Sequence, residues 1–195
     1  TFCSELIRIM EKYPWCSGVD IDLEKGDDYS THAASTAMFK HIYETVKAYD
    51  PSKEMNICLP GMTSVNGSVG GENWCVYGDL DKYCDTASIM SYGMAWAGSA
   101  PGPVSPRSWL EGIYDYATKV MNPDKVFLGM PAYGWNWQIY DTPENLGKYY
   151  RGTSHTYYAA KYWMQGLYNF TDDAPPQPFI PIVSYWDDYD MGPWA

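Results

Sequence analysis

The stretch of the sequence with the clearest chemistry alternates acidic and aliphatic residues with a period of two. It runs GVDIDLE over residues 18–24, so that Asp20, Asp22 and Glu24 recur at every second position. Successive side chains of a β-strand point to opposite faces, so a strand here would place the three carboxylates in one row. Neighbours in that row would be about 6.6 Å apart along the backbone, close enough for their ionisations to couple. The pattern predicts a general acid with an electrostatic helper.

Two other interpretations compete for this acidic row, which we define as Asp20, Asp22 and Glu24. Acids at alternate positions most often mark a solvent-exposed sheet face, because Asp and Glu are rarely buried without a partner. A calcium loop is disfavoured, because Lys25 stands where an EF-hand needs glycine. The turn signal KGDD over residues 25–28 places Glu24 at the carboxyl end of the strand, where α/β folds carry their active sites.

The elements that must position this row repeat with the rhythm of βα units. Strand ends roughly 30 to 40 residues apart are typical of a parallel sheet with helices between its strands. The last third of the chain breaks that rhythm, and residues 64–71 are rich in Gly, Asn and Ser and predict a loop. The periodicities predict helices over 2–12, about 31–50, about 105–120 and 156–168, strands over 16–24, 55–59, 87–92 and 126–131, a proline-rich turn at 174–178 and a β-like run over 179–186.

Composition excludes several classes of partner. The 195 residues include 24 acidic and 13 basic ones, and the formal net charge of −11 argues against nucleic acid and anionic membrane surfaces. No apolar run reaches the ~18 residues that a membrane-spanning helix needs. The five cysteines are odd in number and form no CxxC pair, so we expect free, buried thiols, no metal site and no cofactor. Aromatic residues make up 17% of the chain, which favours flat platforms that stack on sugar rings.

Three motifs in this order resemble glycoside hydrolase family 18, the chitinases and N-acetylglucosaminidases. SGVDIDLE at 17–24 is similar to the DGxDxDxE motif that ends the fourth strand of the family's (β/α)8 TIM barrel, with Ser17 in place of the first Asp. IMSY at 89–92 resembles the sixth-strand motif MxYD, with Gly93 in place of the Asp. VFLGMPAYG at 126–134 resembles the seventh-strand motif LGxPxYG. The most similar branch is the spore-cortex-lytic and phage-associated one.

The resemblance implies that residues 1–195 are an internal part of a single barrel. They would cover about strands 4 to 7 and a following segment, and strands 1 to 3 and strand 8 would lie outside the chain. A complete (β/α)8 barrel typically needs ~250 residues, more than this chain has. The sequence also begins without Met and within a helical pattern, so we expect further sequence to precede it.

The resemblance further implies retaining hydrolysis of β-1,4-linked N-acetylglucosamine polymers, chitin or peptidoglycan glycan, with assistance from the substrate. Glu24 would protonate the leaving glycosidic oxygen, and the substrate's own N-acetyl oxygen would attack the anomeric carbon. Asp22 would orient that N-acetyl group and share a hydrogen bond with Asp20. Tyr92 would donate to the N-acetyl oxygen, and Met90 would pack beneath the sugar.

Other residues and functions stay open at this point. One group of aromatic residues would either form sugar platforms at the mouth of the cleft or pack the top of the barrel: Trp96, Tyr133, Trp135 and Trp137. The alternatives to hydrolysis are a non-catalytic glycan-binding protein, which would commonly lack the acid at Glu24, and a structural barrel in a larger assembly such as a phage tail. An N-acetylglucosamine-containing substrate would place the protein outside the cell, at a cell wall or on a virion.

Overall fold

The structure is a computed structural model of the chain. It describes residues 1–24, 31–65, 67, 73–137 and 151–156 and the strands at 185–187 and 192–194. The chain divides into two compact units: Thr1–Ser91 with Trp109–Gly129 form the first, and Tyr92–Ser108 with Met130–Ala195 form the second. No helix within the described ranges is long and apolar enough to cross a membrane.

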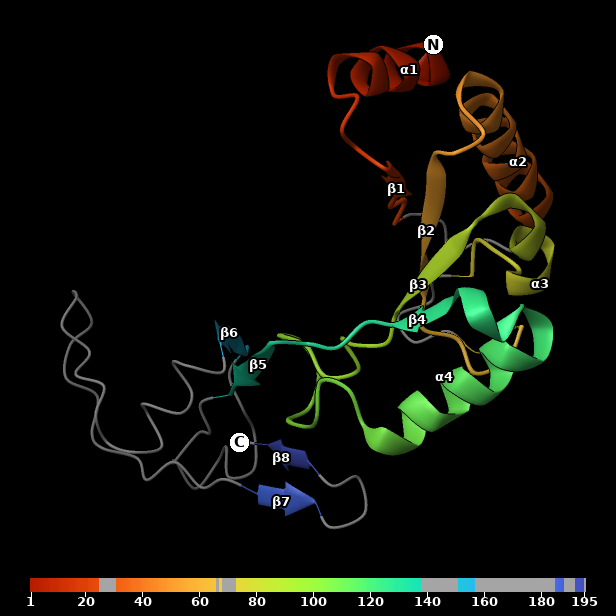
Figure 1. Cartoon of the computed structure of the whole chain (residues 1–195). Coiled ribbons are helices and arrows are strands. Elements are labelled where there is room, and N and C mark those ends of the chain that lie inside the picture. Colours follow the sequence, from red (N-terminus) through yellow and green to blue (C-terminus); the bar gives the residue numbers. More distant parts are fainter. Residues whose placement is uncertain are drawn as a thin grey trace, which may run out of the picture. The chain divides into compact units, whose positions relative to one another are not determined.

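A four-stranded parallel sheet forms the centre of the first unit, and its strands are neighbours in chain order. Figure 1 shows the helices that connect these strands on one side of the sheet. The predicted parallel βα arrangement is therefore confirmed. The elements are α1 (Phe2–Lys12), β1 (Gly18–Ile21), α2 (His32–Tyr49), β2 (Glu54–Pro60), α3 (Tyr77–Leu80), the 3-10 helix η3 (Asp81–Tyr83), β3 (Thr86–Met90), α4 (Arg107–Val120), the 3-10 helix η4 (Pro123–Lys125) and β4 (Val126–Leu128).

The core of this unit lies between the sheet and its helices. Alternate residues of β2 (Met55, Ile57 and Leu59) are fully buried, whereas Asn56 and Cys58 between them are only half-buried. This alternation is what a sheet with one helix-covered face requires. The helices bury one apolar stripe each: Phe39, Ile42 and Val46 in α2, and Trp109, Ile113 and Ala117 in α4.

Charged side chains tie the strands together at their amino ends. Asp85, just before β3, accepts a hydrogen bond of 2.7 Å from the backbone N–H of Met55 and pairs with Lys47 of α2 at 2.8 Å. Lys125 donates to the carbonyl oxygens of Asp81 and Cys84 at 2.6 and 3.0 Å. In TIM-barrel folds the amino ends of the strands serve stability, which leaves the carboxyl ends for function.

Gly18, which starts β1, is required by the close approach of the next strand. It pairs with Glu54 of β2, and a Cβ at Gly18 would collide with the backbone carbonyl oxygen of that residue. Only glycine permits this approach without a shift of the backbone. The glycine in the sequence motif therefore serves the pairing that places Asp20 beside β2.

The second unit contains two antiparallel strand pairs that the sequence analysis did not predict. They are β5 (Tyr133–Asn136) with β6 (Thr153–Thr156), and β7 (Tyr185–Asp187) with β8 (Gly192–Trp194). Thr156 ends β6, so the helix predicted from about Thr156 does not include that residue. Residues 157–168 and the proline-rich turn at 174–178 lie outside the described residues, as does most of the β-like run, whose last two residues fall in β7.

Candidate active site

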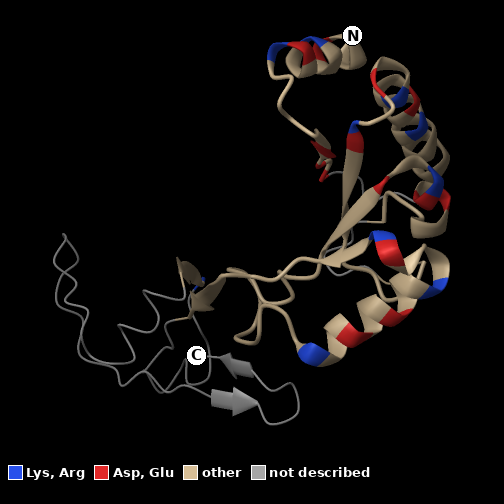
Figure 2. Ribbon diagram, in the orientation of Figure 1, with Lys and Arg blue, Asp and Glu red and all other residues tan. Residues whose placement is uncertain are grey.

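The acidic row begins in β1 and continues beyond its end. Asp20 is exposed in the strand, and its neighbour Ile21 is buried, as the alternation predicts. The strand ends at Ile21, so the prediction of one strand continuing through Glu24 is wrong. Asp22 and Glu24 follow the strand as exposed residues, and the acidic colour at this end of β1 is visible in Figure 2. The row thus extends past the carboxyl end of β1.

Asp20 is held by side chains of the neighbouring strand. It lies opposite Asn56 in the parallel register, and the Asn56 amide donates to Asp20 Oδ1 over 2.7 Å. The thiol of Cys58 donates to the same oxygen, with Sγ and Oδ1 3.4 Å apart. Asn56 Oδ1 in turn accepts hydrogen bonds from the hydroxyls of Thr86 and Ser88, at 2.9 and 3.2 Å. We call these five residues of three adjacent strands the sheet network.

The pKa of the Cys58 thiol reflects the negative charge of the acidic row. Its partial burial, its hydrogen bond to Asp20 and the negative charges of Asp20, Asp22 and Glu24 raise its pKa from 9.0 to about 12. The thiol therefore stays protonated at neutral pH and acts as a donor. All three members of the acidic row contribute to this shift, so their fields converge on one position of the sheet.

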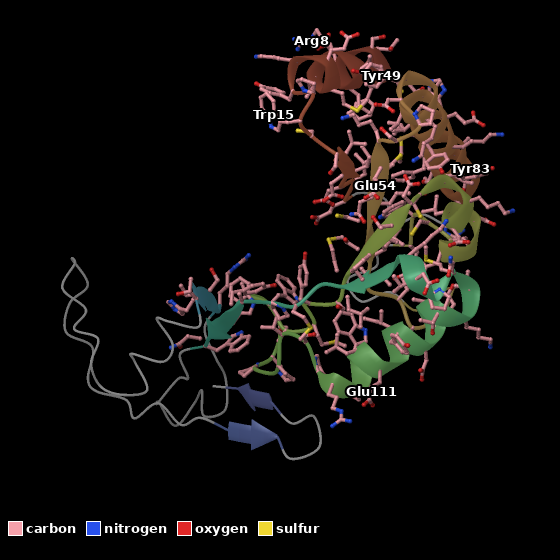
Figure 3. All side chains as sticks on the ribbon, viewed as in Figure 1. Arg8, Trp15, Tyr49, Glu54, Tyr83 and Glu111 are labelled. Carbon is pink, nitrogen blue, oxygen red and sulfur yellow. The ribbon has the colours of Figure 1, made fainter. Side chains whose placement is uncertain are left out.

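Sequence reasoning missed the other four residues of the sheet network. Their signal was present, because β2 reads EMNICLP and β3 reads TASIM, and both strands alternate polar with apolar residues. The polar positions of both strands share the face of Asp20, whereas the apolar positions face the helices. Glu54 does not join the row, since it starts β2 at the amino end of the sheet (Figure 3).

The remaining predicted site residues divide between the two units. Met90 is half-buried and ends β3, two residues after Ser88, so it lies at the carboxyl end of the sheet. Tyr92 follows β3 by two residues and belongs to the second unit. Its ring meets Tyr133 edge-on, with 6.4 Å between centroids, and Tyr133 meets Trp135 in the same way at 6.3 Å. Three of the predicted residues thus form one aromatic chain.

The aromatic residues differ in their exposure. Trp96 is 51% exposed and available to a ligand, whereas Trp137 is 6% exposed and packs inside the second unit. Tyr133 starts β5, five residues after β4 ends, and so belongs to the hairpin of the second unit and not to the parallel sheet. The prediction of sugar platforms stays open for Trp96, Tyr133 and Trp135, and the buried Trp137 fits the packing interpretation.

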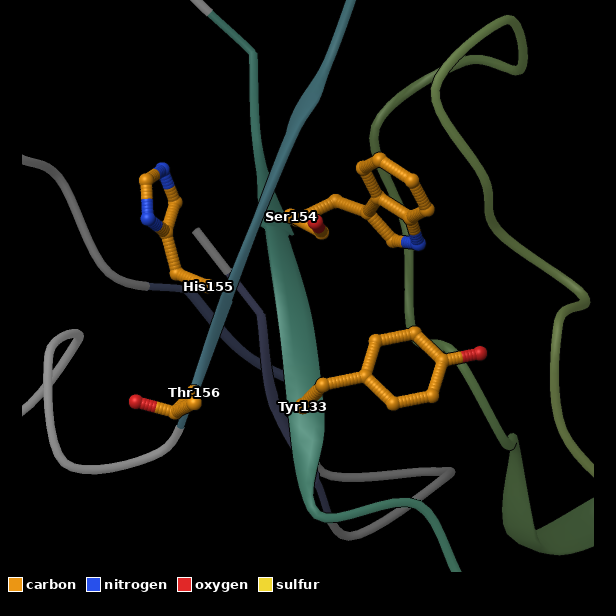
Figure 4. Close-up of a pocket in the computed structure, with 5 residues that line it drawn as sticks. Tyr133, Ser154, His155 and Thr156 are labelled. Carbon is orange, nitrogen blue, oxygen red and sulfur yellow. The ribbon is translucent and has the colours of Figure 1, made fainter.

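The hairpin of β5 and β6 carries a shallow hollow of about 360 Å³. In Figure 4 the phenol ring of Tyr133 and the imidazole of His155 point away from the hairpin on opposite sides. Burial lowers the pKa of His155 below 6.5, which favours the neutral imidazole. The lining residues are Tyr133, Trp135, Ser154, His155 and Thr156, and none of them belongs to the acidic row.

The remaining reactive groups to consider are the cysteine thiols and the side chains that could bind a metal ion. All five cysteines are free, as predicted, but only Cys75 and Cys84 are buried. Among the residues that the structure describes, no group of three or more His, Cys, Asp or Glu side chains could hold a metal ion. The described site offers the carboxylates of the acidic row, the hydroxyls of Thr86 and Ser88, the Asn56 amide and the Cys58 thiol.

Comparison with known proteins gives this arrangement a context. YvbX, an uncharacterized glycosylase of Bacillus subtilis, is 22% identical over 143 residues, which are 72% of this chain and 40% of YvbX. The cortical fragment-lytic enzyme of Bacillus anthracis is 29% identical over 92 residues, 47% of this chain and 21% of that enzyme. The chain thus spans less than half the length of these two relatives.

Structural comparison and the family model agree with each other. The crystal structure of a chitinase from Chromobacterium violaceum matches 98% of this chain and 52% of that chain, with a TM-score of 0.76 at 16% identity. This likeness, together with the parallel sheet and its helices, shows a TIM-barrel-type fold. The model of the family described as "Glycosyl hydrolases family 18" matches residues 1–190. The chain therefore belongs to glycosyl hydrolase family 18.

Proposed function

We propose that the full-length protein hydrolyses β-1,4-linked N-acetylglucosamine polymers with Glu24 as the general acid. The observation that carries this proposal is the acidic row at the carboxyl end of β1, with Asp20 held from the adjacent strand. We infer that β1 to β4 correspond to strands 4 to 7 of a (β/α)8 barrel. Active sites of this fold lie at the carboxyl ends of the strands, the same end at which the row is found.

The proposed reaction is substrate-assisted and retains the configuration of the sugar. Glu24 gives its proton to the glycosidic oxygen while the N-acetyl carbonyl oxygen of the substrate bonds to the anomeric carbon, and the glycosidic bond breaks. Water then opens the cyclic intermediate, and the Glu24 carboxylate takes up a proton from that water. Asp22 holds the N–H of the N-acetyl group, and Tyr92 donates to its oxygen before attack. Met90 supports the sugar from below.

Chitin and the glycan of peptidoglycan are the two proposed substrates. The names of the relatives favour both, because one is a chitinase and another is a cortical fragment-lytic enzyme. Exposed aromatic faces at Trp96 and Tyr133 are suited to stacking on either polymer. Both polymers occur outside the cytoplasm, so we propose an extracellular, cell-wall or virion location for the protein.

Replacement of the acid tests the proposal. Glu24→Gln in the full-length protein keeps the shape of the side chain but removes the transferable proton, so turnover should fall by ~10²–10⁴-fold while glycan binding persists. The matched control is Glu44→Gln, an exposed residue of α2 whose loose pair with Lys40 spans 3.8 Å. Turnover would be measured on chitooligosaccharides and on purified peptidoglycan. Equal turnover by wild type and Glu24→Gln would assign the acid to another residue.

Glycan binding without cleavage is the second candidate function. It is favoured by Gly93 and Ser17, which stand where the resemblance places acidic residues. The intact Glu24 argues for cleavage, since the proton donor is present. A full-length protein that binds chitooligosaccharides and releases no products would establish this second function instead.

A further inference from the structure

The sheet network contains two residues that contact the acidic row from β2, Asn56 and Cys58. We propose that Asn56 and Cys58 are positioning residues that fix Asp20, and through it the acidic row, for glycan hydrolysis. This inference rests on the proposed function. It adds two side chains that act on the reaction through Asp20 and do not touch the reacting atoms.

The orientation of the Asn56 amide is set from both sides. Its oxygen accepts from two hydroxyls, Thr86 Oγ1 at 2.9 Å and Ser88 Oγ at 3.2 Å, and its nitrogen faces Asp20 Oδ1 at 2.7 Å. In the flipped orientation the amide oxygen would face the carboxylate oxygen and repel it. The two hydroxyls therefore direct the N–H toward Asp20, and they stabilise a hydrogen bond to a charged acceptor.

Both donors converge on a single oxygen of Asp20. The amide of Asn56 and the thiol of Cys58 bond to Oδ1, and no donor among the described residues reaches Oδ2. The high pKa of Cys58, about 12, keeps its proton in place for this bond. The hydrogen bond between Asp20 and Asp22 that the family resemblance implies would use the other oxygen, Oδ2. The two donors thus clamp the carboxylate of Asp20 at one oxygen.

The clamp lies on the most regular part of the fold. Asn56 is opposite Asp20 on one side and opposite Thr86 on the other, so the contacts run directly across three paired strands. Asp22 and Glu24 follow β1 and have no strand partner, which leaves Asp20 as the member of the row fixed by the sheet. Side chains on rigid elements hold catalytic geometry more precisely than loops do. Positioning of the row therefore begins at Asp20.

The first test removes the amide. Asn56→Leu has nearly the same size but cannot donate, so kcat on chitooligosaccharides should fall about 10- to 100-fold with KM nearly unchanged, as for a misplaced catalytic group. A double-mutant cycle with Asp20→Ala shows whether Asn56 acts through Asp20. The double variant should then be no slower than Asp20→Ala alone, because the second change removes a partner that is already lost.

The second test uses the thiol, where a conservative variant exists. Cys58→Ala should lower kcat about 2- to 10-fold, the worth of one hydrogen bond, and Cys58→Ser should restore most of it through its hydroxyl donor. Cys84→Ala is the matched control. It removes a buried thiol that donates to the backbone oxygen of Asp81 over 3.9 Å, and it should leave kcat unchanged even if it lowers thermal stability.

The outcomes separate this inference from the proposed function. A wild-type protein that cleaves no glycan overturns the proposed function, and this inference with it. A wild-type protein that cleaves, with Asn56→Leu and Cys58→Ala equal to it in kcat, overturns the positioning role alone. Additive losses in the double-mutant cycle overturn the route through Asp20. If Asn56→Leu does not fold, the comparison of Cys58→Ala with Cys58→Ser decides the question.

Discussion

Cys58 should react with alkylating reagents far more slowly than an ordinary thiol. Burial, the hydrogen bond to Asp20 and the charges of the acidic row raise its pKa from 9.0 to about 12. At pH 8 a thiol of pKa 9.0 is about 9% thiolate and one of pKa 12 is about 0.01% thiolate, so the reactive form is roughly 1,000-fold rarer. A more basic thiolate is the stronger nucleophile. With a Brønsted slope of about 0.4–0.5, the rise in pKa from 9.0 to about 12 makes each thiolate roughly 16- to 30-fold more reactive, which offsets part of the loss. The net expectation is alkylation roughly 30- to 60-fold slower than that of a free thiol.

The assay follows native alkylation by iodoacetamide at pH 8, with peptide mass spectrometry to assign each modified cysteine. Cys16 is exposed and serves as an internal control on reagent and access. Asp20→Asn should accelerate Cys58, because it removes the negative acceptor and its charge, and should leave Cys16 unchanged. The acceleration should be partial, since burial is the largest cause of the raised pKa. Cys58 reacting as fast as a free thiol, or equally in wild type and Asp20→Asn, would refute the geometry of the clamp.

Two further predictions concern the substrate and Gly93. Deacetylated chitooligosaccharides should resist cleavage by full-length protein that cleaves the acetylated forms, and equal hydrolysis of both substrates would exclude substrate assistance. A thiazoline mimic of the cyclic intermediate should inhibit the protein strongly, because the mimic resembles the species that Asp22 and Tyr92 would hold. Gly93 has φ +87°, and a Cβ there would meet no atom within 4 Å, so Gly93→Ala should lower the free energy of unfolding through backbone strain alone. We expect a loss of about 1–2 kcal/mol in urea titrations, and an unchanged transition midpoint would contradict it.

Much of the parallel sheet could be predicted because its signals are local. Helix α1 ends before Tyr13 and Pro14, and α2 ends before Asp50 and Pro51, where proline forbids continuation. The four strands carry aliphatic residues at alternate positions next to turn signals. Such patterns depend only on residues close in sequence, so they can be recognised without knowledge of the tertiary structure.

The hairpin of β5 and β6 lacked a signal of this kind. Strand β6 reads TSHT and carries no apolar alternation, and it pairs with a segment that belongs to the seventh-strand motif of the family. Its pairing with β5 therefore depends on contacts between segments distant in the sequence. Propensity placed Thr156 in a helix, whereas its pairing with Tyr133 places it in β6.

Within the site, too, the acidic row could be predicted from local sequence, whereas the residues that hold Asp20 could not. Asp20, Asp22 and Glu24 lie within a single short segment, so their chemistry could be recognised from spacing alone. The partners of Asp20 depend on register, which local patterns leave open. A shift of β2 by one residue would turn its apolar residues away from the helices, which excludes it, but a shift by two would keep them buried. One such shift would place Glu54 opposite Asp20 and set two carboxylates against each other, and the other would place Cys58 there and move the amide away. Of these three registers, the observed one places the Asn56 amide directly opposite the Asp20 carboxylate. The same register pairs Glu54 with Gly18, where only glycine permits the close approach of the two backbones.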